Sequence, residues 1–389
     1  MRDAVIVEAV RTPIGKGKPN GALAQVHPVA LLSHTLRALV ERSGIDPALV
    51  DDVIGGTVDQ VGEQAMNTTR YAWLGAGFPE SVPATTVDRQ CGSSQQAVHF
   101  AAQGVMAGAY DVAIACGVES MSRVPMWSNV PPGADPFGPG VAERYPEGLV
   151  PQGISAELIA AKWSIGREEM DAYAVTSHQR AAAAWADGLF DAEVAPIAGL
   201  SRDESVRPGT TAEILAGLRP SFEDPGFAER FPQIEWSVTA GNSSPVNDGA
   251  SAVLVMAGET AERLGLRPLA RLHSFAVTGS DPLLMLTGVL PATEKVLKRA
   301  GLALDDIGLF EVNEAFASVV LAWLQETGAD PSRLNVHGGA LALGHPLGAS
   351  GTRLMTTLVH AMRARGARYG LQTMCEAGGL ANATILEAL

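Results

Sequence analysis

The chain has 389 residues, of which 47% are hydrophobic and 18% charged, enough apolar material for a large buried core in two or three domains. The formal net charge is −14, and no run of Lys or Arg is present, which argues against a nucleic-acid groove or an anionic membrane surface as partner. The three Cys and eight His show no CxxC, HxH or HExxH spacing, so neither a metal site nor a disulfide framework is indicated.

The first residues, MRDAVIVEAVRTPIGKGKPNG, indicate an apolar strand followed by a polar turn. They lack the apolar segment and small-residue cleavage site of a signal peptide. No apolar run reaches the length of about 18 residues that crosses a bilayer. We therefore expect a soluble, cytoplasmic protein.

Strand-like runs alternate with helical stretches in the first 120 residues, which predicts layers of α/β structure. Strands are expected at 4–7, 53–56, 84–87 and 112–115, and helices at 29–43 and 94–107. Between about 120 and 248 a Pro/Gly loop, two helical stretches and a Pro-rich acidic stretch indicate an excursion from these layers. Its helices are expected at 154–163 and 167–189. Alternation resumes in the segments 252–256, 271–277, 293–300, 307–312 and 315–327.

A weak internal repeat accompanies this pattern. A constant offset of 259 residues pairs Cys91 with Ser350, Tyr110 with Tyr369, and Cys116 with Cys375. Each half of the repeat has the order turn, helix, strand, although the sequence identity is slight. The repeat predicts two duplicated halves, near 1–118 and 269–389, with the excursion inserted between them.

The segment 85–94, TTVDRQCGSS, places Cys91 at a polar turn just before a predicted helix. Backbone N–H groups and the dipole at a helix N-terminus favour a thiolate, and Gly92 leaves room for a substrate beside the sulfur. The alternative is a small buried Cys that packs the end of a strand. The spacing alone leaves both interpretations open.

The segment 338–351, GGALALGHPLGASG, surrounds His345 with Gly and other small residues. Such a rigid loop suits an imidazole that exchanges protons near neutral pH at a fixed place in a cleft. A core His bonded to a backbone carbonyl is the alternative. The high density of Gly favours a functional role.

In FEVNEAFA, residues 310–317, Asn313 stands where a predicted strand turns into a helix. An N-cap is one interpretation of this position. The other is an amide that holds a water, which in turn donates a hydrogen bond into an oxyanion hole.

The segment 369–383, YGLQTMCEAGGLANA, ends an apolar strand at Cys375 and follows it with a Gly pair that exposes backbone N–H groups. Cys375 is either a second reactive thiol or a buried strand residue. Burial in a strand is what we expect for Cys116.

Taken in order, these four segments resemble signatures of the thiolase family, and the likeness covers essentially the whole chain. VEAVRTPIGK, VESMS and TAGNSSPVNDGASA look like further signatures, and GHPLGASG together with NEAFA is highly specific. The resemblance implies two duplicated α/β/α halves, five layers in all (αβαβα). The expected division has three parts. Residues 1–118 with 249–268 form the N-terminal half, and residues 269–389 form the C-terminal half. Residues 119–248 form a loop domain that binds CoA and makes oligomer contacts.

By this resemblance the chain is a degradative acetyl-CoA C-acyltransferase, which uses CoA to cleave a 3-oxoacyl-CoA into acetyl-CoA and a shortened acyl-CoA. Cys91 would attack the β-carbonyl and carry the acyl group, and His345 would accept its proton. Cys375 would protonate the departing carbon and later deprotonate CoA. Oxyanion sites are implied at His345 with an Asn313-held water, and at the backbone N–H groups of Cys91 and Ala377. CoA enters as a substrate, and no permanently bound cofactor is implied.

Matching family positions also gives a CoA site. Arg207 would lie at the adenine–phosphate end, Leu218 beneath the adenine and Ser244 against the pantetheine.

The chain departs from the family pattern at three places. CEAGG replaces Cys-x-Gly-Gly-Gly, so the Cβ of Ala377 is expected to narrow the site and to disfavour a positive φ. Gln152 stands where biosynthetic members tend to have Met, and Met285-Leu-Thr-Gly-Val289 replaces Met-Gly-x-Gly-Pro. The last two changes predict an acyl pocket for groups longer or bulkier than acetoacetyl, steroid side chains included.

Several alternatives remain at this stage. A biosynthetic acetoacetyl-CoA thiolase would use the same residues. A ketoacyl synthase-like enzyme shares Cys, His and Asn but needs no second thiol, so Cys375 counts against it. A non-catalytic acyl-CoA-binding relative is disfavoured because all four candidate groups are present. The family resemblance further implies a homodimer or homotetramer.

Overall fold

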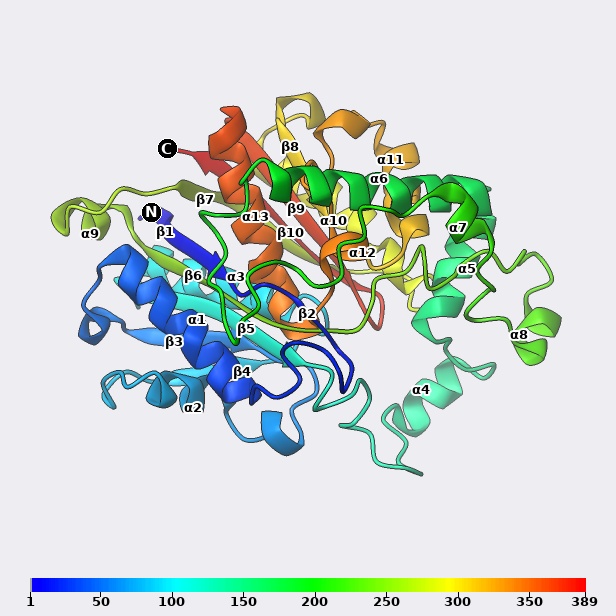
Figure 1. Ribbon diagram of the computed structural model, residues 1–389, viewed down its shortest axis with the longest axis horizontal. Coiled ribbons are helices and arrows are strands. Elements are labelled where there is room, and N and C mark those ends of the chain that lie inside the picture. The colour runs from blue at the N-terminus through cyan, green and yellow to red at the C-terminus, as the bar shows by residue number, and fades with distance from the viewer. Residues whose placement is uncertain (1) are drawn as a thin grey trace.

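The computed structural model describes residues 2–389, and the ten strands found there join in one sheet (Figure 1). Nine of them follow the order β4-β3-β5-β6-β1-β7-β10-β9-β8, and β2 pairs with β6. The strands are β1 (Ala4–Arg11), β2 (Gly15–Lys16), β3 (Asp52–Gly56), β4 (Ala84–Val87), β5 (Val112–Ser120), β6 (Asn247–Ala257), β7 (Ala270–Gly279), β8 (Leu309–Val312), β9 (Tyr369–Glu376) and β10 (Leu380–Ala388).

The sheet is built as two mirrored halves. Outward from the central strands β1 and β7, the neighbours β6, β5 and β3 on one side match β10, β9 and β8 on the other. The central strands share only two residue pairs, Val5 with Arg271 and Ile6 with Ala270. Because so few pairs join them, the two half-sheets are free to stack with helices between them.

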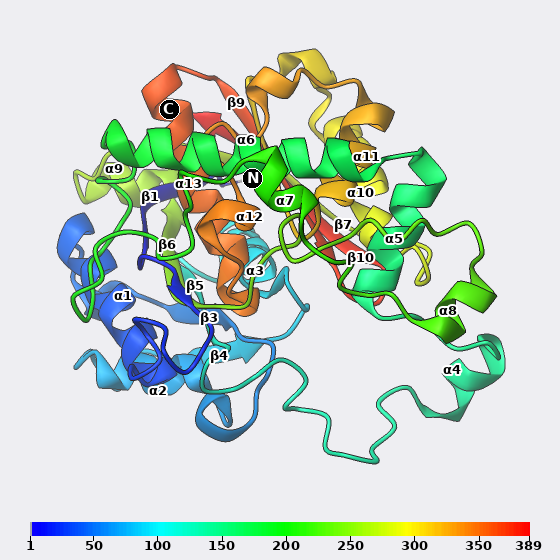
Figure 2. The same cartoon turned by 45° about the vertical axis from the view of Figure 1, so that its right-hand side comes forward.

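Helices occupy three layers around the half-sheets, as Figures 1 and 2 show. Helices α1 (Pro28–Ser43) and α2 (Thr68–Gly75) cover the outer face of the first half, and α10 (Val289–Ala300) and α11 (Ala317–Thr327) cover that of the second. Between the halves lie α3 (Ser93–Ala107) and α13 (Ser350–Arg365), whose apolar residues share one core with both half-sheets. This arrangement confirms the predicted α/β fold of five layers.

The two central helices are suited to burial on every side. In α3, residues such as Ala97 and Ala101 are small enough for close packing, and ten of the fifteen residues are buried. Each helix ends at a glycine in the left-handed region, Gly108 (φ 76°) after α3 and Gly366 (φ 65°) after α13. The two helices begin side by side, since the backbone N–H of Thr352 donates to the Ser94 hydroxyl (3.0 Å), next to the loops that carry the candidate residues.

The segment between β5 and β6 leaves the layers. It contains α4 (Gly138–Arg144), α5 (Gln152–Trp163), α6 (Arg167–Ala186), α7 (Ala212–Ala216) and α8 (Pro225–Arg230). In Figure 2 its first part runs along the lower edge of the molecule to α4. The remaining helices are α9 (Gly258–Arg263) and α12 (Ala340–Leu343).

Several elements differ from the sequence-based expectation, and β1 and α2 are among them. The strand predicted at 4–7 continues to Arg11, because residues 8–11 stay paired with β6; the buried Arg11 guanidinium bonds to the buried carboxylates of Glu193 (2.5 Å) and Asp203 (2.7 Å). Helix α2 was not predicted from the sequence; it starts at Thr68, and the side chain of its N-cap Asn67 accepts a hydrogen bond from the backbone N–H of Arg70.

Within residues 2–389 no helix is both long and apolar enough to cross a membrane. The same residues contain no cluster of three or more His, Cys, Asp or Glu side chains that could hold a metal ion.

Candidate active site

Cys91 lies in a tight turn between β4 and α3, and its side chain is 5% exposed. The preceding residue, Gln90, has a φ of 50°, a left-handed conformation that is costly for a residue with a Cβ. Asp88 accepts a hydrogen bond from the backbone of Gln90 (2.6 Å), and the Ser93 hydroxyl donates to the carbonyl of Gln90 (2.6 Å). These bonds hold the strained turn and fix the direction of the Cys91 side chain.

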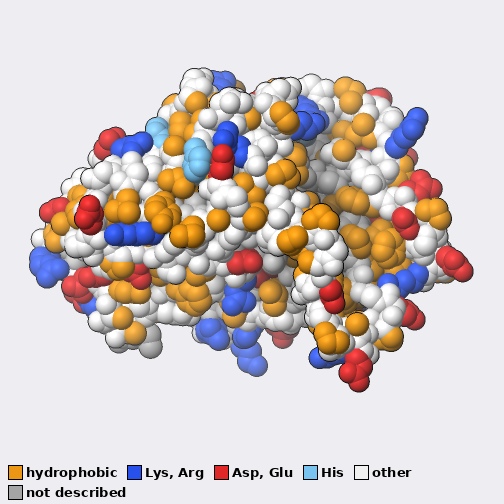
Figure 3. Space-filling model, turned by 90° about the horizontal axis from the view of Figure 1, so that it is seen from below, with side chains coloured by type: hydrophobic (Ala, Val, Ile, Leu, Met, Phe, Trp, Pro, Cys, Tyr) orange, Lys and Arg blue, Asp and Glu red, His pale blue; other side chains and the backbone are white. Residues whose placement is uncertain are grey.

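Two cavities meet at Cys91. Cavity A (≈ 310 Å³) is also lined by His345 and Cys375, and cavity B (≈ 320 Å³) by Met285 and Ala377. Both cavities are bordered by Gln152 and by the following apolar residues: Met126, Trp127, Pro151 and Leu347. Figure 3 shows hydrophobic side chains gathered around a hollow on the side of the molecule where α4, α5 and α8 lie.

His345 is held at three of its atoms. Its backbone N–H donates to Asn247 Oδ1 (2.9 Å), and its Nδ1 lies 2.6 Å from the hydroxyl oxygen of Ser350. That hydroxyl donates its only proton to the carbonyl of Pro346 (2.8 Å), so it accepts a hydrogen bond from Nδ1–H. The Nε2 atom, 3.5 Å from Asn313 Nδ2, therefore carries the lone pair. This tautomer makes Nε2 the atom that accepts a proton.

Asn313 is fully buried between β8 and α11, behind His345. Its backbone N–H donates to the carbonyl of Thr373 (3.0 Å). Helix α11 begins four residues later, with Phe316 at the N-cap, so the N-cap interpretation of Asn313 is wrong. The Oδ1 atom of Asn313 faces no donor among residues 2–389, which leaves the amide available to a water or a substrate group.

Cys375 lies at the end of β9, where it is 1% exposed and pairs with Ala381 of β10. In the turn that follows, Gly378 (φ 83°) and Gly379 (φ 79°) take the left-handed positions. Ala377 is not among the residues with a positive φ, so the expected backbone penalty of its Cβ is absent. The Cβ lies instead in the wall of cavity B.

Burial makes the resting site electrically neutral. It raises the pKa of Cys91 well above its usual value, and the charges of Cys375 and Glu376 raise that pKa further. Burial followed by the charge of Glu376 raises the pKa of Cys375 to about 12. Burial and then Arg353 lower the pKa of His345 to about 3. Desolvation thus outweighs the helix N-terminus that was expected to favour a thiolate, and Cys91 needs a base to lose its proton.

The other predicted site residues fall into two groups. Ser244, whose backbone N–H donates to the carbonyl of Ala315 (2.9 Å), lines cavity A and is half-buried. Arg207 and Leu218 are exposed and border neither cavity A nor cavity B. The structure therefore brings Cys91, His345 and Cys375 together and leaves these two residues on the surface.

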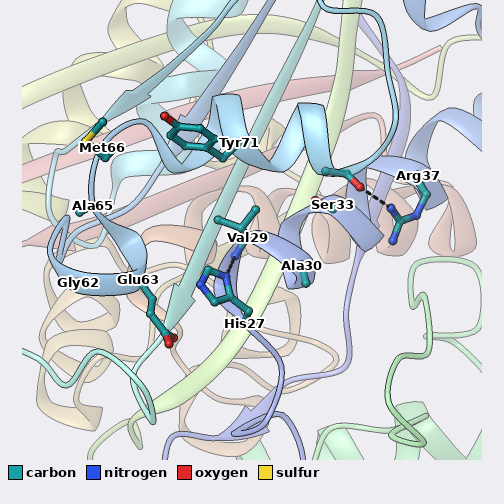
Figure 4. Close-up of a pocket in the computed structure, with 11 residues that line it drawn as sticks. His27, Val29, Ala30, Ser33, Arg37, Gly62, Glu63, Ala65, Met66 and Tyr71 are labelled. Atoms are coloured by element: carbon teal, nitrogen blue, oxygen red, sulfur yellow. Dashed lines mark hydrogen bonds between the residues drawn. The ribbon is translucent and has the colours of Figure 1, made fainter.

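A larger cavity of ≈ 550 Å³ lies between α1 and α2, and Figure 4 shows the residues around it. Three of its polar side chains already have partners. His27 Nδ1 accepts from the backbone of Val29 (3.2 Å), and Arg37 donates to the carbonyl of Gly75 (3.1 Å), while Glu63 is paired with Arg123. None of the three cysteines lines it, so the chemistry is to be sought at Cys91.

Sequence reasoning missed two residues that position His345. Ser350 belongs to the same Gly-rich motif, five residues after His345, and a hydroxyl within reach of the ring was the available signal. Asn247 comes from β6, almost one hundred residues earlier, and no local pattern indicates that its side chain reaches this loop.

Comparisons with known proteins cover nearly the whole chain. Residues 4–259 match the family model "Thiolase, N-terminal domain", and residues 266–388 match "Thiolase, C-terminal domain". The chain is 47% identical to the steroid 3-ketoacyl-CoA thiolase FadA6 of Mycobacterium tuberculosis over 400 aligned residues, which cover 100% of this chain and 95% of the relative. It is 44% identical to the 3-ketoacyl-CoA thiolase of Bacillus subtilis, with 100% of both chains covered. The crystal structure of the Bacillus anthracis acetyl-CoA acetyltransferase superposes with a TM-score of 0.90 at 38% identity, covering 100% of this chain and 99% of that one.

Proposed function

The chain belongs to the thiolase family, and on that premise we propose that it is an acyltransferase that cleaves 3-oxoacyl-CoA thioesters with CoA. The products are acetyl-CoA and an acyl-CoA shortened by two carbons. The observation that carries this proposal is the convergence of Cys91, His345 and Cys375 on one cavity. One thiol forms the thioester, the imidazole moves its proton, and the second thiol protonates carbon, which is what a reversible Claisen cleavage requires.

In the first half-reaction the Cys91 sulfur attacks the β-carbonyl while its proton passes to His345 Nε2. The Cα–Cβ bond then breaks, and its electron pair stays on the α-carbon as the enolate of acetyl-CoA. The Cys375 thiol protonates that carbon, which leaves an acyl group on Cys91 and a thiolate on Cys375. The high pKa of Cys375 suits this step, because the thiol is still protonated when the carbanion forms.

In the second half-reaction the Cys375 thiolate takes the proton of the incoming CoA thiol. The CoA sulfur attacks the acyl carbon, and Cys91 leaves and recovers its proton from His345. The enolate oxygen is proposed to rest between the protonated Nε2 of His345 and a water held by Asn313. Removing one such donor costs about 100- to 1,000-fold in rate. The other oxyanion is assigned to the backbone N–H groups of Cys91 and Ala377.

Cavities A and B divide the substrate between them. Cavity A contains Ser244, and we assign it to the pantetheine arm of CoA, with Arg207 and Leu218 at the surface for the adenine–phosphate end. Cavity B has an apolar wall and is assigned to the acyl chain. That wall contains Val58, Met126, Trp127, Val130, Phe137, Leu149, Val150, Met285 and Leu347.

The size of cavity B favours a long or bulky acyl group over acetoacetyl. The volume of cavity B, ≈ 320 Å³, exceeds what the terminal methyl group of an acetoacetyl chain requires. The similarity to a relative named as a steroid 3-ketoacyl-CoA thiolase supports this choice. The likeness to an acetyl-CoA acetyltransferase keeps acetoacetyl-CoA as the competing substrate.

Three further proposals concern the chain as a whole. We propose a homodimer or homotetramer, because within residues 2–389 β4 pairs with β3 alone, which leaves the backbone groups of its other edge available to a second copy. A cytoplasmic location is consistent with the lack of a spanning helix in residues 2–389. The proposed division into 1–118 with 249–268, 119–248 and 269–389 is supported by β6, which returns from the insertion to pair with β1 and β5.

The proposed function is tested by measuring acetyl-CoA release from 3-oxoacyl-CoAs of graded length and bulk. Cys91→Ala and Cys375→Ala are each expected to lower kcat by at least about a thousandfold. Retention of turnover in Cys91→Ala would refute the acyl-enzyme route. Acetoacetyl-CoA as by far the best substrate would refute the assignment of cavity B.

A further inference from the structure

Glu119 is a buried carboxylate that the proposed reaction does not use. It lies near the end of β5 with no exposed surface, and it belongs to the half-sheet that carries Cys91. Val58, whose backbone N–H bonds to this carboxylate, packs in one apolar cluster with Cys91 and Leu347. Burying an acid here is costly unless the carboxylate is fully hydrogen-bonded.

Four donors converge on this carboxylate. Oε2 accepts from the backbone N–H groups of Val58 (2.9 Å) and Gly348 (2.8 Å). Oε1 accepts from the backbone N–H of Asp59 (3.2 Å) and from the side-chain amide of Gln64 (2.6 Å). Glu119 thus ties the loop after β3 to the loop after His345, which come from opposite halves of the chain.

The His345 loop is pressed directly against this junction. A Cβ on Gly348 would lie 2.7 Å from the Cα of Thr57 and 2.8 Å from Glu119 Oε2. A Cβ on Gly117, two residues before Glu119, would lie 2.2 Å from the carbonyl oxygen of Gly348. Glycines on both sides therefore allow the backbone contact, and Glu119 supplies the bonds that keep it closed.

We infer that Glu119 is a positioning residue, which in its ionised form clamps the His345 loop at working distance from the Cys91 turn. All four partners are donors, so the carboxylate needs no proton, and a proton added to it would face N–H groups. The inference rests on the proposed thiolase chemistry and adds to it a residue that touches neither substrate nor reacting atoms.

The pH dependence expected for this clamp follows from Glu119 itself and from the titratable groups around it. Burial raises its pKa to about 7 against the opposing hydrogen bonds. Asp59 and Asp248, on the neighbouring loop and on β6, also have pKa values raised by burial, and their carboxylates accept hydrogen bonds from the backbone N–H groups of Asn129 (3.3 Å) and Ser122 (2.9 Å). His345 has a pKa near 3 and Cys91 one well above its usual value. Protonation of Glu119 as the pH falls is then expected to loosen the clamp and lower activity.

The test compares Glu119→Gln with wild type in two assays between about pH 5.5 and pH 9. One measures kcat and KM for 3-oxoacyl-CoA cleavage, and the other measures alkylation of Cys91 by iodoacetamide through peptide mass spectrometry. We expect kcat and alkylation to fall at least about tenfold with KM within about threefold, because the base is displaced from the thiol. The acidic limb of the wild-type profile is expected to disappear in the variant.

Glu157→Gln is the matched control. Glu157 is also a buried carboxylate, accepting from the backbone N–H groups of Ser237 (3.0 Å) and Val238 (2.8 Å), but it borders neither cavity at Cys91. It should lose thermal stability while kcat, alkylation and the acidic limb remain those of wild type. An equal loss of kcat in both variants would show that Glu119 acts only through general stability.

Electrostatics alone predicts the opposite alkylation result, because removing the negative charge of Glu119 would lower the pKa of Cys91 and speed its alkylation. Faster or unchanged alkylation in Glu119→Gln therefore overturns the inference. If that variant does not fold, Gln64→Leu removes one donor and should move the acidic limb to higher pH, and an unmoved limb overturns it. A wild-type protein without acetyl-CoA release would refute the proposed function, whereas the alkylation assay would still test Glu119.

Discussion

Ser350→Ala tests how the tautomer of His345 is set. The substitution removes the hydroxyl that accepts a hydrogen bond from Nδ1–H at 2.6 Å. A buried donor left without a partner costs about 1–3 kcal/mol, and the ring relieves this cost by moving its proton to Nε2 or by rotating. Since 1.36 kcal/mol corresponds to a tenfold change, kcat should fall by about 5- to 150-fold. The KM for CoA should change little, because Ser350 lines neither cavity.

The assay is the initial rate of 3-oxoacyl-CoA thiolysis, combined with ¹⁵N NMR of the imidazole to identify the protonated nitrogen. Ser318→Ala is the control, since Ser318 is a buried serine whose hydroxyl likewise donates to a backbone carbonyl, that of Ala156 (3.0 Å). It should lower stability by a similar amount and leave kcat unchanged. A Ser350→Ala enzyme with wild-type kcat, or one with Nδ1 still protonated and kcat reduced, would refute the assignment of the tautomer.

Three other predictions concern single side chains. Cys375→Ala should abolish acetyl-CoA release but leave Cys91 open to alkylation by iodoacetamide, and loss of that labelling would mean that Cys375 only supports the fold. Ala377→Gly, which widens cavity B without relieving backbone strain, should raise kcat/KM for the bulkiest acyl-CoA relative to the shortest, and identical ratios across the series would contradict this. Burial lowers the pKa of His99 to about 3, so its neutral form contributes stability that is present above pH 6.5 and is lost as the pH falls toward 3. Urea unfolding should therefore show a shallower acid decline for His99→Gln, by roughly 1–4 kcal/mol at pH 4, and an unchanged slope would be evidence against it.

The local sequence pattern predicted much of this fold because strands, turns and helices follow one another in the same short order in both halves. The strand at 84–87 and the starts of the strands at 53 and 112 were placed to within one residue. The pattern did not predict that the first strand extends to Arg11. The carboxylates that pair with its buried side chain lie more than 180 residues away in the sequence. In the sequence alone, a polar residue within a strand indicates the end of that strand, and its distant partners become known only from the fold.

Motifs located the candidate side chains better than they indicated the protonation states of those side chains. Cys91, His345 and Cys375 were chosen from the glycines and turns around them, and the structure brings all three to cavity A. The prediction that Cys91 rests as a thiolate was wrong. The sequence gives no measure of desolvation, and desolvation is the largest cause that raises the pKa of Cys91. Glu119 was passed over for the same reason, since its four donors come from segments at 58–64 and 348 that only the fold brings together.

Cys116 and Cys375 show why position in a duplicated fold does not decide chemistry. They are equivalent in the repeat, on β5 and β9, and burial raises the pKa of both thiols. Cys116 is enclosed in the core under α1 and α2, as expected from its strand. Cys375 borders cavity A, whose walls include Phe222 and Ser244 from the segment between β5 and β6. The inserted segment therefore supplies part of the wall of the cavity that Cys375 borders, whereas Cys116 borders neither cavity A nor cavity B.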